Sequence, residues 1–249
     1  MPKIYESSVD TIRETFAVLI GFAVTEFIGD RFKEGGAADF TAWVLSLSLI
    51  LLVLRLFIGT ANHLETTYAE DEGGEFNRTT GCFLKDIGFL IAFGLMSVLI
   101  ARSDPAAPES FLKRTMLLLL ITSLWSVGDA LWHWLMSSGK PRWYRWWLFC
   151  DSCQFLLTAV FWRWAPRLPG DCWLLPRGWG LRGLVLVLLF AGFFIVDVRN
   201  ILKMRQFKAT AAQPEPFSVG YAPLGAAALL GAVAVCWWSG EPAWPHGPL

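Results

Sequence analysis

The sequence predicts an all-α protein, a polytopic membrane helix bundle with about seven transmembrane helices. Hydrophobic residues make up 55% of the 249 residues and charged residues only 17%, a composition that is not typical of a soluble globular chain. The chain also contains about seven apolar segments, each close to the roughly 20 residues that cross about 30 Å of hydrocarbon. One of these segments carries an acid and a histidine on a single helical face, which indicates a bundle with a polar interior.

The apolar segments lie at about residues 12–30, 40–62, 83–102, 111–137, 145–165, 181–200 and 217–238. The first follows MPKIYESSVDTIRETF, which lacks the basic stretch and cleavage site of a signal peptide, so we expect it to be retained. The seventh is rich in Gly and Ala, which allows close helix packing, although Pro223 also suits an irregular segment. We expect residues 1–240 to form a single transmembrane domain and residues 241–249 a disordered tail.

The segments between the apolar stretches predict orientation and partners. Lys and Arg are divided almost evenly between the two sides, with a small excess on the N-terminal side, so we expect a cytoplasmic N-terminus in the inner cell membrane. The acidic loop 65–75 and the basic loop 199–208 fall on that side and are candidate contacts for a cytoplasmic protein partner. The formal net charge is zero, so no basic excess favours nucleic acid as a partner.

The fourth segment has the most informative pattern. From Thr115 to Ser138 its polar residues, Asp129 and His133 among them, recur at steps of three, four and seven, which places them on one face of a helix. An ionisable face of this kind is expensive to insert into a bilayer. It is therefore expected to face a bundle interior or a water-filled cavity.

Polar residues of several segments are expected to meet in the same half of the membrane, because alternate segments run in opposite directions. Arg55 is expected to pair with Asp129 or Asp151, since a lone Arg at that depth is costly and its planar fork suits carboxylates. Lys85, Asp86 and Arg199 belong to the same charged layer. The predicted binding residues are Arg55, Asn62, Asp129, His133, Asp151, Gln154 and Asp197.

We interpret this layer as a polar cavity that is open to one side and closed by apolar residues on the other. The leading hypothesis is that the protein binds or transports a small cation, a proton or a polar solute, without catalytic activity or a cofactor. A structural hydrogen-bond network that holds the helices together is the alternative for the layer as a whole.

Two further functional classes remain open. Asp129 and His133 have the i, i+4 spacing of metal ligands on one helix, and His63 ends the second segment at a compatible depth. A zinc site of His63, Asp129 and His133, with Asp151 as base, would make the chain a metal-dependent intramembrane hydrolase. The other class is a non-catalytic sensor or anchoring subunit that uses loops 65–75 and 199–208.

The spacing of Cys150 and Cys153 is that of a redox pair. Asp151 lies between them and disfavours a thiolate, so we expect buried, inert thiols.

Overall fold

The computed structural model describes residues 2–32, 40–68, 76–103, 108–135, 143–164, 180–210 and 221–238, with side chains described over most of each range. Within these ranges the secondary structure is helical, so the predicted all-α fold is confirmed. The tail 241–249 lies outside the described residues.

Seven helices form the described part of the chain, and each predicted segment falls largely on one of them. They are α1 (Pro2–Phe32), α2 (Phe40–Tyr68), α3 (Phe76–Ala101), α4 (Pro108–Leu135), α5 (Trp143–Trp164), α6 (Gly180–Thr210) and α7 (Tyr221–Trp238). The seventh segment is a regular helix. Pro223 lies in its first turn, where a missing backbone N–H costs no helical hydrogen bond.

Two of the predicted loops overlap with helices. The basic stretch 199–208 is the last part of α6, which continues to Thr210, so its prediction as a loop is wrong. Charged residues end an apolar span, but residues such as Leu202, Lys203 and Met204 are good helix formers and the backbone continues. Of the acidic loop 65–75, the residues up to Tyr68 belong to α2, and 69–75 lie outside the described residues.

Four helices contain a stretch that is long and apolar enough to cross a membrane. The stretches are Phe40–Leu64, Phe83–Ala101, Pro108–Leu131 and Arg182–Lys203, and α7 has a shorter apolar stretch, Tyr221–Trp237. Large apolar side chains also face outward on α6 and α7, with Leu188, Ile195 and Leu230 exposed. A chain with these features is compatible with a membrane protein.

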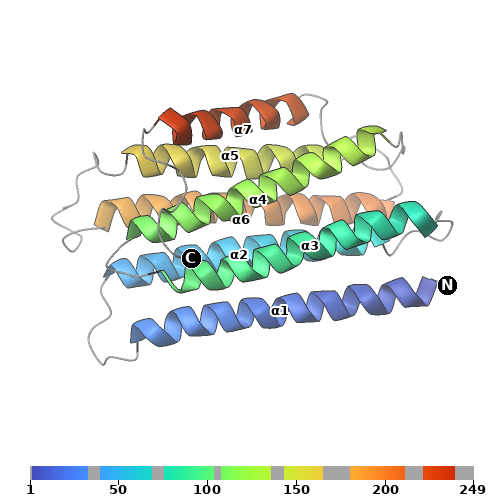
Figure 1. Cartoon of the computed structure of the whole chain (residues 1–249), viewed down its shortest axis with the longest axis horizontal. Helices are drawn as coiled ribbons and strands as arrows, with labels where there is room; N and C mark the ends of the chain where they lie inside the picture. The colour runs from blue at the N-terminus through green and yellow to red at the C-terminus, as the bar shows by residue number, and fades with distance from the viewer. Residues whose placement is uncertain are drawn as a thin grey trace.

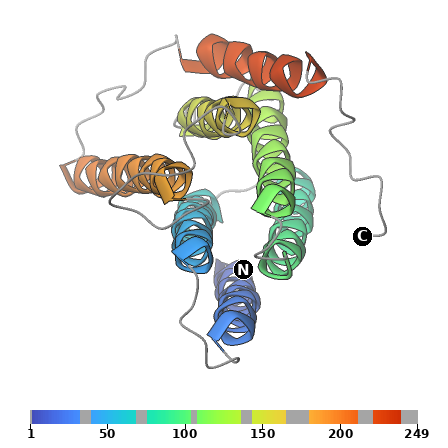
Figure 2. The ribbon, with the colours of Figure 1, turned by 90° about the vertical axis from the view of Figure 1, so that its left-hand side faces the viewer.

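The helices lie side by side along the long axis of the molecule (Figure 1). In the view along the bundle, α1, α2, α6, α5, α4 and α3 follow one another around a ring, and α7 packs on the outside of α5 (Figure 2). We call the end at which α1 begins, on the right in Figure 1, the near end, and the opposite end the far end. The ring allows side chains from α2, α3, α4, α5 and α6 to meet in its interior.

The interior of the far half is filled mainly by apolar side chains. Large side chains from successive helices are fully buried there, including Leu45 and Leu49 of α2, Ile100 of α3, Phe111 of α4 and Leu186 of α6. The ion pair at this end, from Arg102 Nε to Glu26 Oε1 at 2.9 Å, is on the outside, with Arg102 58% exposed. The buried charged residues of the described chain lie in the near half.

Candidate functional site

Arg55 of α2 is the centre of the most deeply buried charged group. Its Nε donates a hydrogen bond to Asp197 Oδ2 of α6, and its two terminal nitrogens donate to Asp151 Oδ1, at 2.7 Å, and to Gln154 Oε1, both of α5. The side chains of Arg55, Asp151 and Asp197 are only 1%, 3% and 2% exposed. We call Arg55, Asp151, Gln154 and Asp197 the Arg55 cluster.

The sequence of α5 explains how two partners reach one guanidinium. Asp151 and Gln154 are three residues apart, so they lie on the same face of the helix. The ring of Phe193 covers the guanidinium, with its centroid 5.7 Å from the Arg55 Cζ. The planar fork of Arg55 thus joins α2, α5 and α6 at one point.

The Arg55 cluster has more acceptor and acid groups than its single cation can satisfy. Asp151 Oδ2 accepts a further hydrogen bond from Ser126 Oγ of α4 at 3.0 Å. Asp197 Oδ1 and Gln154 Nε2 are buried, and neither has a hydrogen-bond partner among the described residues. With both carboxylates ionised, the cluster carries one excess negative charge in a place that water does not reach, which is energetically costly.

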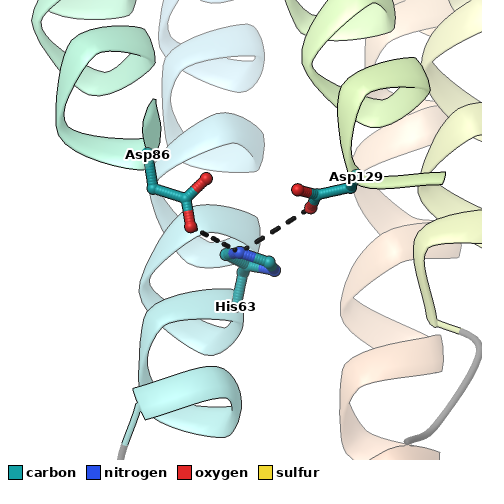
Figure 3. Close-up of side chains that lie close together, drawn as sticks. All are labelled: His63, Asp86 and Asp129. Carbon is teal, nitrogen blue, oxygen red and sulfur yellow. Dashed lines mark hydrogen bonds and ion pairs between the residues drawn. The ribbon is translucent and has the colours of Figure 1, made fainter. Parts of the chain in front are cut away.

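A second group of ionisable residues lies closer to the near end. His63 Nε2 of α2 is 3.1 Å from Asp86 Oδ2 of α3 and 3.8 Å from Asp129 Oδ2 of α4, so that the imidazole lies between the two carboxylates (Figure 3). The Lys85 ammonium contacts Asp86 Oδ1 at 3.2 Å and also Asp129 Oδ1. We call His63, Lys85, Asp86 and Asp129 the His63 cluster.

Trp125 of α4 holds the His63 cluster in place. Its Nε1 donates a hydrogen bond to Asp86 Oδ1 at 2.8 Å, which fixes the carboxylate and turns Oδ2 toward His63. The imidazole of His63 packs edge-on against the indole, with ring centroids 4.9 Å apart and planes at 80°. A buried indole N–H ordinarily finds an acceptor, and here the acceptor is a residue of the site.

The two clusters are close neighbours. Arg55 and His63 are eight residues apart on α2, about 12 Å along the helix axis. A pocket of about 10 Å³ lies beside the Arg55 cluster, bordered by Arg55, Thr60, Trp125 and Asp151 among others. That volume is about what one water molecule needs, and it is far too small for a solute of several heavy atoms.

Five of the seven predicted binding residues belong to the two clusters. Arg55, Asp151, Gln154 and Asp197 meet in the first, and Asp129 belongs to the second. Asn62 is buried on α2 next to His63. The backbone of His133 belongs to α4, but its side chain lies outside the described residues, so the predicted zinc site of His63, Asp129 and His133 stays a prediction.

Some members of the site were not among the predicted binding residues. Lys85 and Asp86 appear in the sequence only as charges of the polar layer, and the structure places Lys85 against Asp129 and Asp86 against His63. Trp125 was not predicted, because the indole is largely apolar and does not stand out in an apolar segment. A signal was available, since Trp125 lies one helical turn before Asp129, on the same side of α4. Arg199 of the predicted layer is exposed on α6.

The described cysteines, Cys150, Cys153 and Cys236, are free thiols. Cys150 is buried beside Asp151 in sequence and forms no disulfide with Cys153.

No protein-family model, curated protein or solved structure matches this chain. The function of the two clusters therefore has to be inferred from their own residues.

Proposed function

We propose that this chain is a multi-pass membrane protein whose buried clusters bind and move a proton or a small monovalent cation. The observation that supports this most directly is the Arg55 cluster, in which two almost completely buried carboxylates share one guanidinium. One bound proton or monovalent cation would balance the excess negative charge. Intramembrane charges beyond what helix packing needs are typical of ion and proton pathways.

The size of the pocket favours a proton or a bare cation over a larger solute. The pocket holds about 10 Å³ and is bordered by Arg55 and Asp151 of the Arg55 cluster and by Trp125, the hydrogen-bond donor to Asp86. One water there would lie between Asp151 and Trp125, and so would shorten the gap that an ion crosses between the two clusters.

The exposure of the side chains gives the proposed path a direction. Lys85 and His63 are 23% and 13% exposed, whereas the members of the Arg55 cluster are nearly inaccessible. The ion would enter from the near end through the His63 cluster and reach the Arg55 cluster next. The far half is filled by side chains such as Leu45, Leu49 and Phe111, so crossing requires the ring to rearrange. A cytoplasmic near end in the inner cell membrane is part of the same proposal.

The test is ion flux in liposomes that contain the purified protein. A potassium gradient with valinomycin sets the membrane potential, and an internal pH dye reports proton entry; replacing external sodium by a large impermeant cation separates proton flux from sodium flux. We expect flux well above that of protein-free liposomes, and we expect Asp197→Asn to lower it at least tenfold.

Glu26→Gln is the matched control, because it removes the same charge from an acid at the far end that pairs with exposed Arg102. It should leave the flux at the parent level. The proposal is wrong if the parent shows no flux above empty liposomes, or if folded Asp197→Asn conducts as well as Glu26→Gln.

A further inference from the structure

Three potential metal ligands from three helices converge in the His63 cluster. One nitrogen of His63 and one carboxylate oxygen each of Asp86 and Asp129 all lie within 4.8 Å of one another (Figure 3). Two ligand atoms that are each about 2.1 Å from a tetrahedral metal ion lie about 3.4 Å apart. The distances from His63 Nε2, 3.1 Å to Asp86 and 3.8 Å to Asp129, lie on either side of that value.

The donor set also suits a particular class of metal. One imidazole nitrogen and two carboxylate oxygens are ligands for zinc and neighbouring divalent transition metals, whereas Mg²⁺ prefers oxygen ligands alone. Trp125 donates to Asp86 Oδ1 and leaves Oδ2 directed at His63. Such a hydrogen bond from outside the ligand set orients a carboxylate for a metal.

A cation of the protein itself already lies at this place. The Lys85 ammonium contacts both carboxylates of the triad, Asp86 at 3.2 Å and Asp129. A lysine has a long flexible stem, and Lys85 lies two residues into the apolar stretch of α3 and is partly exposed. Its ammonium can therefore withdraw toward the membrane surface while the carboxylates stay in the ring.

We propose that His63, Asp86 and Asp129 form a site for a divalent transition metal of the zinc class, and that the Lys85 ammonium occupies this site as an internal competitor. Lys85 supplies one positive charge against two carboxylates. A divalent ion supplies two and gains the imidazole as a third ligand, so metal binding displaces the ammonium. The proposal does not rest on ion transport, because it concerns binding to the purified protein.

The experiment is a zinc titration of the detergent-purified, chelator-treated, tag-free protein by calorimetry. Lys85→Met removes the competing charge and keeps most of the side-chain volume, so it should bind zinc at least tenfold more tightly than the parent. Adding His63→Gln to this variant removes the nitrogen ligand and should weaken binding at least tenfold. Magnesium should bind far more weakly than zinc to every variant.

Arg102→Met is the matched control, because it also removes a cation that pairs with a carboxylate, but at the far end. Its zinc affinity should equal that of the parent. Equal affinity of Lys85→Met and the parent overturns the proposal, and so does zinc binding that survives His63→Gln. If Lys85→Met does not fold, the parent and its His63→Gln variant decide: a parent that binds zinc no better than His63→Gln overturns the proposal.

Discussion

Replacing Arg55 by methionine is expected to destabilise the protein by about 3–5 kcal/mol, the range found when one partner of a buried ion pair is removed. Methionine fills most of the space of the arginine stem but supplies no charge. Asp151 and Asp197, at 3% and 2% exposure, would then be two buried carboxylates with no cation beside them.

The magnitude follows from the contacts of the guanidinium. Arg55 donates to Asp151, Asp197 and Gln154, and a hydrogen bond that involves a charged group contributes about 1.5–3 kcal/mol. Three such bonds give an upper limit of roughly 4.5–9 kcal/mol. The loss is smaller than this limit because the bonds share one side chain, because Asp151 keeps its bond from Ser126, and because the orphaned carboxylates can take up protons.

A triple variant separates lost charge pairing from lost packing. Arg55→Met combined with Asp151→Asn and Asp197→Asn has no buried charge left in the cluster, and replacing a whole buried ion group by neutral residues is often nearly neutral for stability. We therefore expect the triple variant to regain most of the stability that Arg55→Met loses.

The assay is reversible unfolding in mixed micelles with a denaturing detergent, followed by helical circular dichroism. Arg102→Met is the control and should cost less than about 1 kcal/mol, since its ion pair with Glu26 is on the surface. The reasoning is refuted if Arg55→Met costs no more than Arg102→Met, or if the triple variant is as unstable as the single one.

Two further predictions concern packing and hydrogen bonding. Gly225→Ala should destabilise the protein by about 1–3 kcal/mol, because the new Cβ would lie 2.9 Å from the backbone of Leu148 in α5. Gly231→Ala should cost less, because the nearest atom to its new Cβ is 3.5 Å away. Equal unfolding midpoints of the two variants would contradict this packing. Trp125→Phe should cost about 1–3 kcal/mol by removing the hydrogen bond to Asp86, and the exposed Trp164→Phe should be close to neutral in the same assay. A Trp125 variant as stable as Trp164→Phe would mean that the bond contributes nothing.

The helices could be predicted from the sequence because an apolar stretch of about 20 residues is a strong and local signal. Their ends could not. In α1 and α6 the apolar pattern stops, near residues 12 and 200, while the helix extends to Pro2 and Thr210 through charged residues that favour helical backbone. Hydrophobicity marks what enters lipid, and it does not mark where a helix ends.

The contents of the site were partly predictable for a different reason. Depth along each segment predicts that Arg55 and Asp151 are at the same level, and the cost of a lone buried arginine predicts that they pair, as the structure has it. The depth of a residue along its segment does not show which helices are neighbours around the ring. Asp129 was therefore an equal candidate partner for Arg55, yet it lies against Lys85 and His63 instead.

The division of the polar residues into two clusters, instead of one continuous layer, gives α4 a particular place in the site. Its adjacent residues Trp125 and Ser126 donate to different clusters, the indole to Asp86 and the hydroxyl to Asp151. A carboxylate that changes its charge alters the hydrogen bond that it accepts. Here the two donor residues are directly linked by a peptide bond. We therefore expect a change of charge in the His63 cluster to affect the Arg55 cluster through Trp125 and Ser126 of α4, and also through α2, which supplies both Arg55 and His63.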